Sequence, residues 1–252
     1  MRFFLTLLAI AAVLYLAGCA ALFFLQRSMI YFPQPRASAA SSERMTLAAG
    51  SEQVIVSVVR RDGPKALIYF GGNAEDVTAN LSSLPAAFPG HAVYLMHYRG
   101  YGGSTGVPSE QGLQRDALLL FDKVHAEHPD VTVIGRSLGS GLAVWLASER
   151  PVGRLVLVTP YESLSGLAAT HFRFFPVRWL LLDKYESGRY APRVTAPTLI
   201  VAAEHDEVIP RWSTEQLHAR FSKGVATMNV IFGTGHNTIS DSPAYWKALQ
   251  EL

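Results

Sequence analysis

Two serines in this sequence lie at the centre of the pattern Gly-x-Ser-x-Gly, the turn that presents a nucleophilic serine in many hydrolases. One is Ser137, in GRSLGSG, and the other is Ser104, in GYGGSTGVP. A nucleophile on such a turn needs a strand directly before it and a helix directly after it. VTVI precedes Ser137 and SGLAVWLAS follows it, whereas TGVP follows Ser104 and cannot begin a helix at once. We therefore predict that Ser137 is the nucleophile and that Ser104 lies on a loop.

A serine hydroxyl becomes a good nucleophile only when a neighbouring base accepts its proton. His236 follows the last apolar run on a glycine-rich loop, GTGHN, from which its imidazole can reach across the strand ends. The acid that orients this base is expected between the serine and the histidine in the chain. Asp206, in EHDEVIP after another apolar run, is the candidate that we favour, and Glu162 is the competing one.

The oxygen of an attacked carbonyl develops negative charge and needs two N–H donors. The residue after the nucleophile supplies one donor from the first turn of its helix, and here that residue is Leu138. The other donor is expected in GGNAED, after the apolar run ALIYF, and Asn73 is our candidate. Two glycines before Asn73 leave the backbone free to turn its N–H inward. Because the chain supplies nucleophile, base and donors, we expect no metal and no organic cofactor.

The elements that must position these residues follow one another in a regular order. Seven runs are typical of strands, and several are apolar throughout, as in strands that are covered on both faces: QVIVSVV, ALIYF, AVYLMH, VTVIG, RLVLVT, TLIVAA and TMNVIF. Helical stretches alternate with them, namely EQGLQRDALLLFDKVHAEH, SGLAVWLASE and STEQLHARF. This alternation predicts an α/β fold with a mostly parallel sheet and helices on both faces. We expect one such domain over residues 50–252.

Residues 161–194 are longer than one strand–helix unit requires and are rich in aromatic side chains. They predict a small, mostly helical insertion over the carboxyl ends of the strands, where open α/β sheets bind ligands. We expect apolar members of this segment to roof the site: Phe172, Phe174, Phe175, Trp179 and residues 180–182. The alternative is that these aromatic residues simply pack in the core.

The first 26 residues differ from the rest of the chain. Phe3 to Leu25 contains no charge, Arg2 and Arg27 bracket it, and as a helix it spans roughly 34 Å at about 1.5 Å per residue. We predict a membrane anchor over residues 1–26, followed by a linker and lead-in over residues 27–49. LAGC, which ends at Cys19, resembles the lipobox of bacterial lipoproteins, in which the cysteine is acylated. A plain secretory signal is a third alternative, and the side of the membrane stays open.

Composition excludes several classes of protein. Hydrophobic residues make up 49% and charged residues 17% of the 252 positions, which excludes a disordered chain. The net charge of +2, carried by scattered Lys and Arg, gives no sign of a nucleic-acid surface. A single cysteine rules out an internal disulfide and a cysteine-based zinc site.

Taken together, several stretches between residues 24 and 237 resemble the membrane-anchored branch of the α/β-hydrolase superfamily: FLQRSMIYFPQP, GGNAED, YRGYGGSTGVPSEQGL, GRSLGSG, EHDEVIP and GTGHN. That branch includes single-pass α/β-hydrolase-domain proteins and their bacterial relatives, some of them protein depalmitoylases. The resemblance implies a triad of Ser137, Asp206 and His236, with oxyanion contacts from Asn73 and Leu138. The family usually has His-Gly before the asparagine, where this chain has Gly-Gly.

These observations predict a serine hydrolase, held at a membrane by a single span or a lipid, that forms an acyl-enzyme on Ser137. Its expected substrates are small-molecule or lipid-like acyl esters or thioesters. An aminopeptidase-like amidase on the same fold is one alternative, since one scaffold hosts many chemistries. A catalytically inactive fold that serves as a binding module is another.

Overall fold

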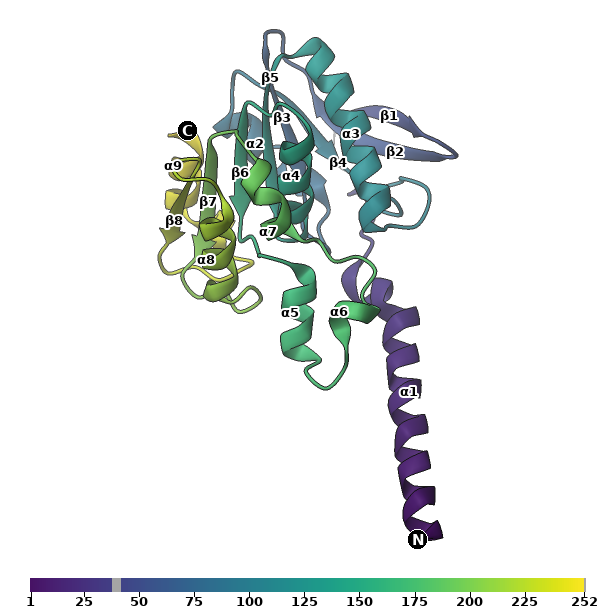
Figure 1. Cartoon of the computed structure of the whole chain (residues 1–252). Helices are drawn as coiled ribbons and strands as arrows, with labels where there is room; N and C mark the ends of the chain where they lie inside the picture. The colour runs from purple at the N-terminus through teal and green to yellow at the C-terminus, as the bar shows by residue number, and fades with distance from the viewer. Residues whose placement is uncertain (38–41, 252) are drawn as a thin grey trace.

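The computed structural model describes residues 1–37 and 42–251, which form one eight-stranded sheet with helices on both faces (Figure 1). The strand order is β1-β2-β4-β3-β5-β6-β7-β8. β1 (Glu43–Ala49) pairs antiparallel with β2 (Glu52–Val59), and β2 pairs antiparallel with β4 (Ala92–Met96). The other pairings are parallel and join β4 to β3 (Lys65–Phe70), β5 (Asp130–Arg136), β6 (Arg154–Val158), β7 (Thr198–Ala203) and β8 (Ala226–Ile231). This arrangement confirms the predicted α/β-hydrolase fold.

Two apolar clusters cover the two faces of the sheet. On one face, side chains of α3 (Glu110–Glu127), α4 (Leu138–Glu149) and α8 (Arg211–Arg220) join the larger cluster. On the other face, α2 (Ser83–Ala87) and α9 (Pro243–Gln250) form the smaller cluster with the opposite side chains of the strands. Every residue of β4 and of β7 is buried as a result, which explains why these strands are apolar throughout. Short 3-10 turns lie at η1 (Val77–Asn80) and η3 (Ile239–Asp241).

The sheet begins before residue 50, where the sequence predicts its start. β1 pairs with β2 along its whole length, from Glu43 opposite Val58 to Ala49 opposite Glu52. Most of β1 is exposed, so its sequence, ERMTLAA, lacks the apolar run by which the other strands are found. Farther upstream, Tyr31 is buried and bonds through its hydroxyl to Asp183 at 3.2 Å. Within the expected linker and lead-in of residues 27–49, Tyr31 therefore contributes to the core and Glu43–Ala49 to the sheet.

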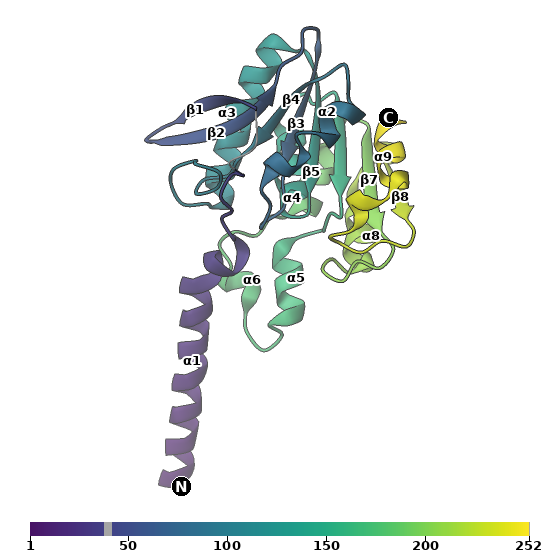
Figure 2. The ribbon, with the colours of Figure 1, turned by 180° about the vertical axis from the view of Figure 1, so that it is seen from behind.

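The insertion between β6 and β7 carries α5 (Leu164–His171), α6 (Val177–Leu180), α7 (Ser187–Tyr190) and the turn η2 (Ala191–Arg193). α5 and α6 project beyond the carboxyl ends of the strands, beside the long helix α1 (Arg2–Ile30), in both views (Figures 1 and 2). The C-terminal end of α1 joins the domain, and its N-terminal end points away from it. Only Gln26 and Ile30 are buried along this helix. The insertion and α1 thus lie on the same side of the sheet.

The loop that holds Ser104 is a packed structural element. The Ser104 hydroxyl accepts a hydrogen bond from the Ile55 N–H at 2.8 Å and donates one to the His97 carbonyl at 2.9 Å. Gly102 has a φ of +57°, and a Cβ at this position would collide with the His97 ring. Burial lowers the pKa of His97 to about 4, so this ring is packed beneath the loop in its neutral form. Through its hydroxyl, Ser104 therefore fastens the loop to β2 and to the residue that follows β4.

We predict that Gly102→Ala destabilises the fold by about 2–4 kcal/mol, because a left-handed φ costs a non-glycine residue about 1 kcal/mol or more and the collision adds the cost of overpacking. Gly50→Ala is the matched control, since Gly50 has a φ of +72° but open space around its Cβ position. Chemical denaturation of the full-length protein in detergent measures both. Equal losses in the two variants would show that His97 imposes no packing constraint.

Candidate active site

Ser137 lies at a sharp turn between β5 and α4. Its φ of 50° and ψ of −118° are strained for a residue with a side chain. The turn is held by a hydrogen bond from the Ser137 N–H to the Val158 carbonyl at 2.9 Å. Both flanking glycines are required by close packing, because a Cβ on Gly135 would collide with the carbonyl of Gly139 and one on Gly139 with that of Phe70. The strand, turn and helix expected around Ser137 are all present.

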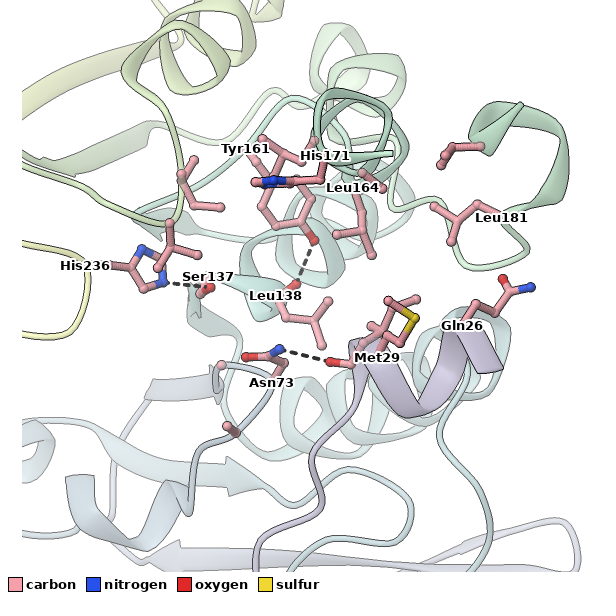
Figure 3. A pocket seen from close by; sticks show the side chains of 18 of the residues that line it. Gln26, Met29, Asn73, Ser137, Leu138, Tyr161, Leu164, His171, Leu181 and His236 are labelled. Carbon is pink, nitrogen blue, oxygen red and sulfur yellow. Dashed lines mark hydrogen bonds between the residues drawn. The ribbon is translucent and has the colours of Figure 1, made fainter. Parts of the chain in front are cut away.

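Two loops bring a histidine and an aspartate to this serine. His236, after β8, places its Nε2 3.0 Å from the Ser137 Oγ (Figure 3), and its Nδ1 lies 2.9 and 3.0 Å from the two carboxylate oxygens of Asp206. A carboxylate beside Nδ1 favours the tautomer with the proton there, which leaves Nε2 free to accept the serine proton. Asp206 is itself fixed by the N–H groups of Val208 and Ile209, at 3.0 and 2.7 Å.

Burial strengthens this arrangement, since the side chains of His236 and Asp206 are only 7% and 8% exposed. Glu207 accepts a hydrogen bond from the His236 N–H at 3.0 Å, and this bond lowers the pKa of the Glu207 carboxyl. The competing acid, Glu162, instead accepts a hydrogen bond from the Ser163 hydroxyl at 2.7 Å. Within residues 1–37 and 42–251, Glu162 forms no hydrogen bond with His236.

The loop that carries Asn73 is held by several groups close to Ser137. Glu75 accepts hydrogen bonds from the Gly72 N–H and from the Tyr69 hydroxyl, both at 2.7 Å. The hydroxyls of Tyr98 and Tyr101 donate to the carbonyls of Gly71 and Asn73, at 2.7 and 2.6 Å. Where the family usually has His-Gly, this chain has Gly-Gly. The Glu75 carboxylate and the Tyr98 and Tyr101 hydroxyls hold this loop in place.

Two backbone donors in this region remain available. Among the described residues, the N–H groups of Asn73 and Leu138 have no hydrogen-bond partner. Leu138 is the first residue of α4, where helix geometry leaves the N–H unpaired. Asn73 belongs to the loop in which a Cβ on Gly72 would lie 3.8 Å from the Ser137 Cβ. Both unpaired N–H groups therefore belong to segments that lie next to Ser137.

The loop also contacts α1 directly. The Asn73 side-chain amide donates to the Ile30 carbonyl at 2.9 Å, and the Phe32 N–H donates to the Asn73 carbonyl at 3.0 Å (Figure 3). The last turn of α1 and the candidate oxyanion loop are thus bonded to one another. Nothing in the sequence pattern of GGNAED signals this connection.

Ser137 and His236 line a cavity of about 520 Å³. Its walls come from the ends of the strands, from the insertion and from α1. The insertion contributes mainly apolar side chains, and α1 contributes Leu22, Gln26, Met29 and Ile30. The α1 residues were missed in the sequence analysis, because the apolar residues of this helix do not by themselves show which face is covered. Gln26, a polar residue in that helix, was the available signal.

The predicted roof of aromatic residues is correct only in part. Phe172, Leu180 and Leu181 line the cavity. Phe174, Trp179 and Leu182 do not, since they are 81%, 87% and 53% exposed. Phe175 does not line it either and stacks against Tyr15 of α1, with ring centroids 5.5 Å apart. The insertion is a hairpin of short helices, so one side faces the cavity while the other faces outward.

In the part of the chain that the structure describes, no group of three His, Cys, Asp or Glu side chains could hold a metal ion. The acid–base chemistry that the arrangement supports is activation of a serine hydroxyl by a buried His–Asp pair.

The sheet order and the turn at Ser137 define an α/β hydrolase. Solved structures support this class: Est1E from Butyrivibrio proteoclasticus matches 82% of this chain and 96% of its own with a TM-score of 0.69 and 15% identity. Alpha/beta hydrolase domain-containing protein 10 from mouse matches 83% of this chain and 96% of its own, with a TM-score of 0.63 and 17% identity. These likenesses show the fold. No protein-family model matches the chain.

Curated sequences give the family. Uncharacterized protein Rv2307c of Mycobacterium tuberculosis is 33% identical over 91% of this chain and 88% of its own length. Lysophosphatidylserine lipase ABHD12 of Macaca fascicularis is 31% identical over 81% of this chain. The matched region is 60% of the length of that lipase. The chain belongs to the family of α/β-hydrolase-domain proteins that includes ABHD12 and these bacterial relatives.

We predict that Asp206→Asn lowers kcat for p-nitrophenyl butyrate by about 10⁴-fold, because an amide at this position favours the wrong imidazole tautomer. KM should change little, since Asp206 does not line the cavity. Glu162→Gln serves as the control and should retain most of the activity. A large loss in Glu162→Gln with little loss in Asp206→Asn would assign the acid to Glu162.

Proposed function

We propose that this protein is a membrane-tethered serine hydrolase that cleaves carboxylic esters of single-chain, lipid-like substrates through an acyl-enzyme on Ser137. The observation that carries the proposal is the chain of hydrogen bonds from Asp206 through His236 to Ser137 at the end of an apolar cavity. The cavity volume of about 520 Å³ falls in the range in which pockets enclose one small ligand. The naming of ABHD12 as a lysophosphatidylserine lipase supports a substrate with one acyl chain.

In the first half of the reaction, the Ser137 Oγ attacks the acyl carbonyl carbon while His236 Nε2 accepts the hydroxyl proton. Asp206 remains ionised and stabilises the imidazolium that forms. The carbonyl oxygen becomes an oxyanion and accepts hydrogen bonds from the N–H groups of Leu138 and Asn73. The tetrahedral intermediate then expels the alcohol, which takes the proton from His236, and leaves the acyl group on Ser137.

In the second half, water attacks the acyl-enzyme as His236 accepts one of its protons. The same two N–H groups stabilise the second oxyanion. Collapse of this intermediate releases the carboxylic acid, and the proton returns from His236 to the Ser137 oxygen. A thioester would follow the same steps, with a thiol as the leaving group.

Membrane tethering is supported by α1. Within the described residues it is the one helix that is long and apolar enough to cross a membrane, and none of its most apolar 18-residue stretch is buried. A signal sequence would pass the same test. The stacking of Tyr15 on Phe175, whose ring lies where a Cβ on Gly18 would be, favours a helix that stays attached, because cleavage before Cys19 would remove both residues. We therefore propose an uncleaved single-span anchor.

We predict that an alkyl fluorophosphonate labels the full-length enzyme at Ser137. Ser137→Ala should abolish labelling, whereas the matched variant Ser104→Ala should keep it, because the buried Ser104 hydroxyl is already bonded to the Ile55 N–H and the His97 carbonyl. Gel fluorescence of a tagged probe measures the labelling. Full labelling of Ser137→Ala would contradict the proposal. Faster cleavage of alanyl or prolyl anilides than of any ester would instead favour the amidase.

A further inference from the structure

One stripe of α1 is covered, although the rest of the helix is exposed. Gly18, Leu22, Gln26 and Ile30 are the partly or fully buried positions that recur every four residues. This spacing places them on one face of a helix. Leu22, Gln26 and Ile30 line the cavity, together with Met29. The helix therefore supplies a wall of the site in addition to its apolar outer surface.

Specific bonds fix this wall in place. The Gln26 amide donates to the Leu180 carbonyl at 3.2 Å and accepts from the Leu182 N–H at 2.6 Å. Gln26 is only 5% exposed, so these bonds are shielded from competing water. Next to it, Arg27 forms an ion pair with Asp183 at 3.1 Å. The last turns of α1 and the segment after α6 thus hold the far part of the cavity between them.

The length of α1 sets the depth of these residues in a membrane. Its 29 residues span about 43 Å at about 1.5 Å per residue, whereas a bilayer core is about 30 Å thick. With Arg2 at the far surface, the hydrocarbon core ends at about Leu22, and the cavity-lining turns lie at the near interface. Tyr15, whose hydroxyl donates to the Phe174 carbonyl at 3.1 Å, then lies roughly 10 Å deeper. The tip of the insertion therefore lies within the apolar layer.

The outward side of the insertion fits this depth. Phe174, Trp179 and Leu182 are the exposed residues that fail to line the cavity. A cluster of large apolar side chains has a lower free energy against hydrocarbon than against water. Arg178, two residues before Leu180 in α6, is also exposed, and its long side chain can reach lipid phosphates at the interface. The same bilayer thus contacts α1 and the insertion.

The cavity extends from the catalytic side chains towards α1. Figure 3 places Ser137 and His236 at one end and Met29, Gln26 and Leu181 at the other. Leu22 is one helical turn beyond Gln26, away from the domain. A substrate with its carbonyl at Ser137 would therefore point its acyl tail along α1, towards the membrane.

We propose that the acyl chain of the substrate enters from the bilayer, lies between α1 and the insertion, and is limited in length by Leu22. This inference rests on the proposed ester hydrolysis at Ser137 and adds the route and the specificity-determining residue. The tail slides sideways from the hydrocarbon between α1 and the insertion without crossing water, and its end stops near Leu22, because Phe175 packs against Tyr15 farther along α1 and closes that end.

Acyl-length preference tests the proposal in the full-length enzyme, reconstituted in phosphatidylcholine vesicles. The substrates are p-nitrophenyl esters from butyrate to palmitate, and the readout is the ratio of kcat/KM for palmitate to that for butyrate. We expect Leu22→Trp to lower this ratio by about tenfold or more, since pocket contacts of one or two carbons discriminate by that amount. Leu22→Ala should shift the preferred length towards longer chains.

Leu25→Trp is the matched control, because Leu25 is 57% exposed and does not line the cavity. It should keep the wild-type ratio. Equal ratios in wild type, Leu22→Trp and Leu22→Ala would overturn the inference while ester hydrolysis stands. A wild-type enzyme that hydrolyses none of the esters would instead refute the proposed function.

Discussion

The close packing of Gly135 and Gly139 around Ser137 is the constraint on which the rest of the site depends. A side chain at Gly139 would collide with the end of β3 and one at Gly135 with α4 itself, so α4 could not begin this close to the sheet. This approach keeps Ser137 at its strained φ of 50° and brings the first N–H of α4 next to the loop after β3. Parallel neighbours β7 and β8 then end at the same edge of the sheet, so that Asp206 and His236 converge on the serine.

A second set of contacts couples this edge to the N-terminal helix. Asn73 bonds to the Ile30 carbonyl through its side chain and to the Phe32 N–H through its carbonyl. Tyr101, from the loop that carries Ser104, bonds to the same Asn73 carbonyl. The last turn of α1 is therefore connected through hydrogen bonds to the loop that we propose as an oxyanion donor. The C-terminal end of α1 is thus part of the candidate site, and the loop that carries Ser104 contacts it through Tyr101.

The sequence carries some of this information and lacks the rest, for physical reasons. Buried strands such as TLIVAA could be predicted because both faces are covered, and the turn at Ser137 because its glycines have a steric cause. β1 could not be predicted, because its first four residues, ERMT, are mostly exposed and lack an apolar pattern. The exposure of Phe174 and Trp179 could not be predicted either, because aromatic residues are common in pockets, in cores and at lipid surfaces. The cavity wall on α1 is a contact between segments some 150 residues apart, which no local pattern encodes.

The central claim is that a lipid-like ester passes its acyl chain to Ser137, and mass spectrometry of the enzyme during turnover tests it most directly. The full-length protein in phosphatidylcholine vesicles is mixed with a monoacyl glycerophospholipid, quenched with acid and digested. We expect the peptide that contains Ser137 to gain the mass of the released fatty acid less one water, and the adduct to disappear when the substrate is exhausted. Hydrolysis without an acylated Ser137 peptide, or an adduct on a different residue, would contradict it.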